Sequence, residues 1–109
     1  MRKVYYRKLI RDKIPEVIKA NGGEYKTKIL DKREFEKELR KKVVEEAKEL
    51  AKASPKDLLN ELSDLLELIK SIALYHKIEF KKVEQNQIKK NRERGGFKKM
   101  LFLIWSSGK

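Results

Sequence analysis

The segment from residue 55 to about 76 constrains the fold most, because as a helix it would have almost no polar face. Large apolar side chains occur around its whole circumference: Leu58, Leu59, Leu62, Leu65, Leu66, Leu68, Ile69, Ile72 and Leu74. A helix that is apolar nearly all round is buried on most sides in a folded protein. A chain of 109 residues has little mass with which to surround such a helix. We therefore expect one domain over residues 1–109 that forms a homodimer or homotetramer by helix packing.

The remaining segments predict a mainly α fold, an antiparallel helix bundle with a minor two-stranded β element. Asp31 can cap one long helix, Ser54 and Pro55 can open the next, and Gly95-Gly96 ends the last. Alternating and continuous apolar runs predict two strands that pair with each other. The expected helices cover residues 11–23, 32–53, 55–76 and 80–94, and the expected strands cover 24–30 and 99–107.

The first long helix places a carboxylate inside its apolar seam. The seam is defined by side chains at three- and four-residue spacing: Phe35, Leu39, Val43 and Leu50. At about 100° per residue, Glu46 projects roughly 20° from Leu39. Glu45 and Glu49 flank Glu46 on one side of this stripe.

The second long helix repeats the arrangement. Glu61 projects between Leu65 and Leu68, and Asp64 lies at the adjoining edge. Both helices therefore direct carboxylates toward the boundary of their packed faces, where an unpartnered charge costs several kcal/mol. Three outcomes are open: a solvated face, a network with lysines, or a divalent cation, for which an all-oxygen shell favours Mg²⁺.

These residues resemble a known family. "KVVEEAKEL" (42–50) followed by "NELSDLLELI" (60–69) is similar to the MazG-like enzymes and phosphoribosyl-ATP pyrophosphohydrolase, the all-α NTP pyrophosphatases. Their signature is a Lys shortly before EExxE, then ExxD on the next helix, with a gap between the pairs that is slightly shorter here than is common in the MazG branch. "KLIRDKIPEVI" (8–18) and "RGGFKKMLFLI" (94–104) extend the resemblance to a small phosphoribosyl-ATP pyrophosphohydrolase-like branch.

The resemblance implies a Mg²⁺-dependent enzyme that hydrolyses a nucleoside triphosphate to a monophosphate and pyrophosphate. Glu46, Glu49, Glu61 and Asp64 would bind Mg²⁺, for which Mn²⁺ is a conceivable substitute. Glu45, Glu46 and Glu49 would form the catalytic set, with Glu45 or Glu49 as alternative general bases. The substrate is either an ordinary or damaged triphosphate, as in a house-cleaning enzyme, or phosphoribosyl-ATP. The terminal segments depart from ordinary phosphoribosyl-ATP enzymes, which favours a triphosphate.

The same resemblance implies phosphate-binding residues. Lys42 belongs to the signature on the first long helix, and Lys82, Asn86 and Lys89 resemble the KxxxNxxK pattern that follows the ExxD helix in MazG-like enzymes. Lys90 and Arg94 form a neighbouring row on the same helix. Such cations can pair with phosphate oxygens, but a solvated basic helix explains the pattern equally well.

Composition narrows the alternatives. The absence of cysteine and the single histidine exclude disulfides, thiolate sites and histidine-cluster zinc sites. A net charge of +12 attracts polyanions, so the rival hypothesis is a nucleic-acid-binding or inactive helical interaction module. Lys8, Arg11 and Lys13 either approach a nucleotide or pair with Asp12, unless Asp12 caps a helix instead. No apolar run suits a membrane span or signal peptide, so we expect a cytoplasmic protein with no membrane partner. The Lys and Glu bias is typical of thermophiles.

Overall fold

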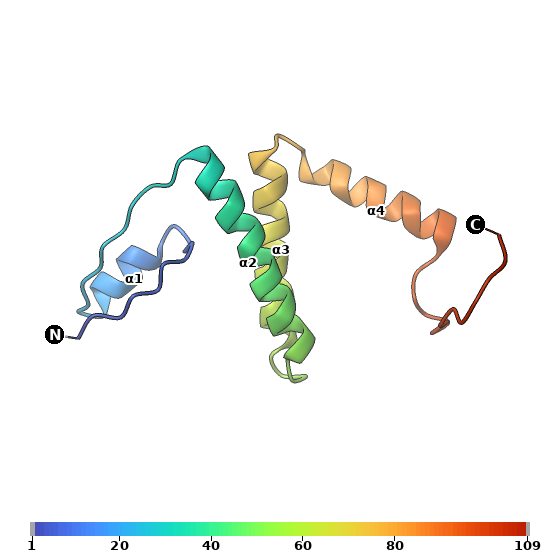
Figure 1. The fold of residues 1–109 in the computed structure, drawn as a ribbon, viewed down its shortest axis with the longest axis horizontal. Coiled ribbons are helices and arrows are strands. Elements are labelled where there is room, and N and C mark those ends of the chain that lie inside the picture. Colours follow the sequence, from blue (N-terminus) through green and yellow to red (C-terminus); the bar gives the residue numbers. More distant parts are fainter. Residues whose placement is uncertain (1, 109) are drawn as a thin grey trace. The chain divides into compact units, whose positions relative to one another are not determined.

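The computed structural model describes residues 2–108, and the regular secondary structure in that range is entirely helical (Figure 1). The mainly α prediction is therefore confirmed. The chain divides into two compact units, Met1–Ile72 and Ala73–Lys109. The helices of the described residues are α1 (Ile14–Ala20), α2 (Lys32–Lys52), α3 (Leu58–Tyr75) and α4 (Phe80–Arg94).

Helix α1 is shorter than the sequence predicts. It begins after Lys13, whose side chain makes no capping hydrogen bond, and Asp12 lies outside the helix. The backbone N–H of Gly23 donates to the carbonyl of Ile18 at 2.9 Å, and Gly22 has a φ of 80°. A glycine with positive φ ends a helix at no steric cost, so the Asn-Gly-Gly run ends α1 as expected.

Helix α2 begins where its cap predicts. The Asp31 carboxylate accepts a hydrogen bond from the Glu34 N–H at 2.8 Å, and the Asp31 N–H donates to the Glu34 carboxylate at 3.5 Å. This reciprocal capping box satisfies two backbone donors at the helix start. It fixes the first turn of the helix that carries Glu46.

The connection between α2 and α3 delays the start of α3 by one turn relative to the prediction. The Ser54 hydroxyl donates to the Asp57 carboxylate at 3.0 Å, and the Asp57 N–H donates to the Ser54 carbonyl at 2.9 Å. Pro55 therefore lies in a turn, and α3 begins at Leu58. After this turn α3 runs antiparallel to α2 and lies beside it (Figure 1).

The predicted seam is the contact between α2 and α3. The side chains of lowest exposure on α2 include Phe35, Leu39, Val43 and Leu50, and on α3 they include Leu65, Leu68 and Ile72. Only three of the described residues are buried: Leu39, Leu68 and Ala73. The core is therefore small, and the half-buried positions along the seam carry much of the contact.

A second stripe on α3 is exposed. Leu59, Leu62, Leu66 and Ile69 recur at spacings of three, four and three residues and are 76, 53, 43 and 40 % exposed. In a single chain this face of α3 is therefore open to solvent, although the sequence predicts a helix buried on most sides. The end of α3 and helix α4 belong to the second unit, where α4 ends at Gly95, with a φ of 81°, as predicted.

The prediction of a two-stranded β element is wrong. Within residues 2–108, neither 24–30 nor 99–107 forms a strand. Met100 has a φ of 55° and donates its N–H to the Phe97 carbonyl at 3.1 Å, so the apolar run starts inside a turn. Ile29, on the other segment, is fully exposed. An isolated two-stranded ribbon is marginally stable in water, and local alternation alone did not supply the partner surface that a strand needs.

None of the helices in the described range is both long and apolar enough to cross a lipid bilayer.

Candidate metal centre

Three carboxylates meet where α2 and α3 face each other. Glu46 comes from α2, and Glu61 and Asp64 come from successive turns of α3. Each offers one oxygen, these oxygens all lie within 4.8 Å of one another, and all three residues are half-buried. Residues three apart on a helix share a face, so the seam that buries Leu68 also brings Glu61 and Asp64 toward Glu46. We refer to Glu46, Glu61 and Asp64 as the carboxylate cluster.

The electrostatics of the cluster show an excess of negative charge. Partial burial raises the pKa of Glu61 above its ordinary value, and the neighbouring charges of Glu46, Asp64, Glu49 and Asp57 raise it further. Like charges disfavour the ionised form of a carboxyl group because each repels the next. The carboxylates of the cluster therefore repel one another, and their negative charge is only partly offset.

One cation contacts the cluster. A terminal guanidinium nitrogen of Arg11 lies 2.7 Å from the Oδ1 atom of Asp64 and donates a hydrogen bond to it. The two side chains are 56 and 43 % exposed, and the residues are 53 positions apart. Arg11 precedes α1 in an irregular segment of the first unit. Within residues 2–108 it is the one cation that forms an ion pair with the cluster.

The cluster fits a small hard cation. Its three ligands are carboxylate oxygens, the donors that Mg²⁺ and Ca²⁺ prefer. Mg²⁺ binds oxygens at about 2.1 Å, so ligands on opposite sides of the ion are about 4.2 Å apart. The 4.8 Å limit on the oxygen separations exceeds this by an amount that rotation of a half-buried side chain can close. Three protein ligands leave positions for water or substrate phosphate, as Mg²⁺ sites usually require.

The other acidic residues predicted for the site lie outside the three-oxygen group. Glu49 is exposed on α2, one turn beyond Glu46, and its charge reaches Glu61 strongly enough to raise the pKa of that carboxyl. Glu45 is exposed on α2. The metal-binding role of Glu49 and the catalytic roles of Glu45, Glu46 and Glu49 stay predictions.

The predicted phosphate-binding residues are distributed over both units. Lys42 is half-buried on α2, one turn before Glu46, and forms no ion pair with a described residue. Lys82, Asn86, Lys89, Lys90 and Arg94 are all exposed on α4, in the second unit. Their part in binding phosphate stays a prediction.

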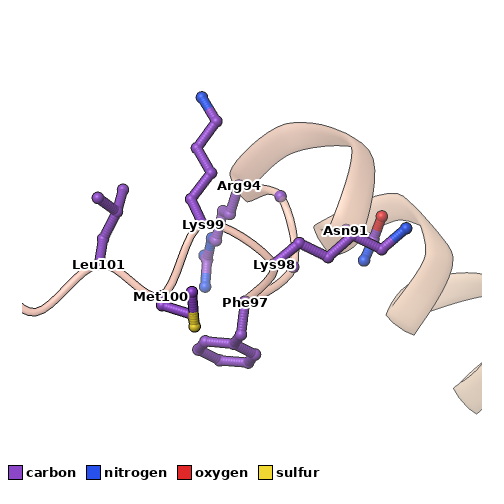
Figure 2. Close-up of a pocket in the computed structure, with 9 residues that line it drawn as sticks. Asn91, Arg94, Phe97, Lys98, Lys99, Met100 and Leu101 are labelled. Carbon is purple, nitrogen blue, oxygen red and sulfur yellow. The ribbon is translucent and has the colours of Figure 1, made fainter.

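A hollow at the end of α4 contains Arg94 together with the following glycine loop (Figure 2). Its lining consists of Asn91 and Arg94 through Leu101, all exposed. Lys98 and Lys99 point in different directions in Figure 2, and Phe97 lies fully exposed beside them. Because these cations do not converge on one point, they do not form a binding site for an anion in the hollow. Gly95 ends a helix there, as the sequence predicts.

The sequence suggested that Arg11 either approaches a nucleotide or pairs with Asp12, but it did not predict the contact of Arg11 with Asp64 in the carboxylate cluster. The position of Arg11 in "KLIRDKIPEVI", within the region of family resemblance, was the available signal. The contact itself joins an irregular segment to a helix 53 residues away, and no periodicity predicts such a pairing.

Comparison with known proteins agrees with this geometry. The family model described as phosphoribosyl-ATP pyrophosphohydrolase matches residues 5–91, which include Arg11, the whole α2–α3 hairpin and most of α4. Neither the curated proteins nor the solved structures give a match. The matched range covers well over half of the chain and contains every residue of the carboxylate cluster. The chain therefore belongs to the phosphoribosyl-ATP pyrophosphohydrolase family, within the MazG-like all-α NTP pyrophosphatases, and is a pyrophosphohydrolase, a hydrolase acting on acid anhydrides.

Proposed function

We propose that the protein hydrolyses a nucleoside triphosphate to a nucleoside monophosphate and pyrophosphate, using Mg²⁺ held by the carboxylate cluster. The observation that carries the proposal is the meeting of Glu46, Glu61 and Asp64 oxygens within 4.8 Å inside a helix seam. Burying a carboxylate in a helix seam costs free energy unless a positive charge lies beside it. A bound divalent cation supplies that charge and gives the arrangement a use.

The residues of the cluster have distinct tasks in this proposal. Glu46 from one helix and Glu61 and Asp64 from the other would hold the ion between them. When bound, Mg²⁺ neutralises charge on the phosphoryl oxygens and lowers the pKa of a coordinated water. Glu49, which adjoins the cluster without belonging to its three-oxygen group, is suited to accept the proton of the attacking water. Glu45 is the alternative base.

The proposed reaction breaks one bond, between the α-phosphorus and the oxygen that bridges it to the β-phosphorus. Water attacks the α-phosphorus, the bond from that phosphorus to the bridging oxygen breaks, and pyrophosphate leaves with the electron pair. The proton of the water passes to the base. Lys42, one turn before Glu46 in the same unit, is a candidate for holding a phosphate oxygen by a charge-assisted hydrogen bond.

Phosphoribosyl-ATP is the second candidate substrate, favoured by the description of the matching family. The bond that is broken is the same in both cases. The segment after residue 91 lies outside the match, and it is one of the terminal segments whose sequence favours a plain triphosphate. A house-cleaning role would follow from a preference for damaged triphosphates.

Pyrophosphate release from a substrate panel tests the proposal. Ordinary triphosphates, oxidised triphosphates and phosphoribosyl-ATP are each supplied with Mg²⁺, with Mn²⁺ or with EDTA. We expect turnover that EDTA abolishes and that Glu46→Gln lowers by about a hundredfold or more, because a ligand that also stabilises the transition state is lost. Glu67→Gln, the same chemical change at an exposed position of α3 outside the carboxylate cluster, is the matched control. Turnover in EDTA, or no turnover with any substrate, would refute the metal-dependent reaction.

The exposed stripe on α3 supports a second part of the proposal, a homo-oligomer formed by this face. Four large apolar side chains in one row, each at least 40 % exposed, are an unusual surface for a monomer. Replacement of Leu62 at the centre of the stripe by Glu should shift the mass in light scattering toward that of one chain and leave helical content unchanged. A wild-type protein that is monomeric at micromolar concentration would contradict it.

The single-domain organisation, cytoplasmic location and thermophilic origin stay predictions from the sequence.

A further inference from the structure

Arg11 links the N-terminal segment to the carboxylate cluster. Its guanidinium nitrogen lies 2.7 Å from Asp64 Oδ1. By contrast, the ion pairs of Lys28 with Glu34 and of Arg40 with Glu36 join positions only six and four apart. The contact therefore connects distant parts of the first unit at the site itself. It is more than local pairing along one helix.

The contact is also easily broken. Both side chains are substantially exposed, at 56 and 43 %, and an exposed ion pair typically contributes less than about 1 kcal/mol. Arg11 lies in an irregular segment, so rotation of its side chain disturbs no helix. A group held this weakly can change partners when a stronger one arrives.

The charge of the site changes when it is loaded. Without a cation, three carboxylates and the nearby Glu49 repel one another, and within residues 2–108 Arg11 is the one cation paired with the cluster. A divalent cation among the same oxygens removes that demand and repels the guanidinium. A nucleotide then brings phosphate oxygens to the same place, and a guanidinium binds phosphate through two parallel hydrogen bonds.

We propose that Arg11 exchanges partners, pairing with Asp64 when the cluster holds no cation and with a phosphate oxygen of the substrate when it holds one. Arg11 is then a substrate-binding residue that is kept at the site by the carboxylate it later releases. This inference rests on the proposed function, since it needs both the ion and the phosphate chain.

Two binding measurements by titration calorimetry test the exchange, on wild type, Arg11→Gln and Arg7→Gln. Arg7 is the matched control, because it lies in the same segment with its guanidinium 5.5 Å from the Tyr5 ring and forms no ion pair with the cluster. Mg²⁺ alone should bind Arg11→Gln as tightly as wild type or up to about tenfold more tightly, since a competing cation is gone. Pyrophosphate with Mg²⁺ should bind Arg11→Gln about ten- to a hundredfold more weakly, the usual effect of losing a charged hydrogen bond. Arg7→Gln should match wild type in both.

Kinetics and a conservative variant add an independent readout. Arg11→Gln should raise KM for the substrate more than it lowers kcat. Arg11→Lys keeps the charge but loses the two-pronged geometry, so its pyrophosphate affinity should fall between those of Arg11→Gln and wild type.

Each of three calorimetric results would contradict a different part of the proposal. Unchanged pyrophosphate affinity in Arg11→Gln, with normal Mg²⁺ binding, would show that the ion pair is structural only. Weaker Mg²⁺ binding in Arg11→Gln would show that Arg11 orients Asp64 in the loaded site and does not leave it. If wild type binds no Mg²⁺ at all, the proposed function fails and the exchange fails with it.

Discussion

Replacement of Glu46 by Gln should have opposite effects on stability with and without Mg²⁺. In EDTA the change removes a negative charge whose oxygen lies within 4.8 Å of the Asp64 carboxylate. Two unit charges at that separation repel by about 0.9 kcal/mol at the dielectric constant of water and by several times more in a less polar setting. Because both residues are only half-buried, we expect the metal-free variant to be more stable than wild type by about 0.5–1 kcal/mol.

With Mg²⁺ the order should reverse. An ion at a hundred times its dissociation constant stabilises the folded state by about 2.7 kcal/mol. If loss of one of three ligands weakens binding about a hundredfold, the same Mg²⁺ concentration stabilises the variant by only about 0.4 kcal/mol. At about 4 °C or more per kcal/mol for a small domain, Tm should rise by about 10 °C in wild type and by about 2 °C in Glu46→Gln.

Thermal unfolding followed by circular dichroism measures both effects, with EDTA and with a Mg²⁺ series. Glu67→Gln makes the same chemical change on the exposed part of α3 and should respond to Mg²⁺ as wild type does. The reasoning is refuted if Glu46→Gln destabilises the metal-free protein, because Glu46 would then be held by favourable contacts. An equal Mg²⁺ response in wild type and variant would remove Glu46 from the ion site.

Three further changes probe the site and its frame. Because the pKa of Glu61 is raised in the folded state above its ordinary value of about 4.5, the folded protein binds more protons than the unfolded chain just above that pH. The contribution of Glu61 to stability is therefore fully present below about pH 4.5 and is lost as the pH rises through the raised pKa; in EDTA, denaturant titrations should show this decline in wild type and a smaller one in Glu61→Gln. Leu39→Ala should lower the free energy of unfolding by about 2–3 kcal/mol, the lower part of the range for a buried leucine in a small core. The exposed Leu59→Ala should change it by less than about 0.5 kcal/mol. Both are measured by urea titration at a concentration at which the chain is monomeric. Asp31→Ala removes the capping box of α2 and should cost about 1 kcal/mol in the same titrations, and an unchanged midpoint would show that the cap does not limit the hairpin.

The parts of the fold that depend on local chemistry could be predicted from the sequence. α2 starts at the expected residue because Asp31 and Glu34 cap each other, and α4 ends at Gly95 because glycine adopts its positive φ freely. α3 starts three residues later than expected, because the contact between Ser54 and Asp57 stabilises a turn in place of a first helical turn. Ser54 and Pro55 fit both the turn and a first helical turn, so the sequence pattern alone does not decide between them.

The carboxylate cluster was predictable for a different reason. Helical projection placed Glu46 and Glu61 inside apolar stripes, and two such stripes on consecutive antiparallel helices must face each other to be buried. The convergence of Glu46, Glu61 and Asp64 follows from that geometry. The contact of Arg11 and the absence of the two strands could not be predicted in this way, because both depend on where irregular segments lie and not on a repeat along one element.

The small core and the carboxylate cluster both limit how firmly α2 and α3 pack together. α2 and α3 pack through a seam in which Leu39 and Leu68 are the buried leucines of the described residues. Three carboxylates occupy further positions along the same seam. Repulsion across the seam, from Glu46 on one helix to Glu61 and Asp64 on the other, works against the hairpin whenever no cation is present. Arg11 offsets only part of it, because it pairs with Asp64 alone through an exposed contact. A bound divalent cation would replace this repulsion with a link between the two helices through the same three oxygens. Ion binding and packing of the two helices should therefore be coupled, so that amide hydrogen exchange in the half of the hairpin that holds Glu46 and Glu61 slows with Mg²⁺ more than exchange near Phe35. Equal slowing at both ends would show that the ion stabilises the protein without acting through this seam.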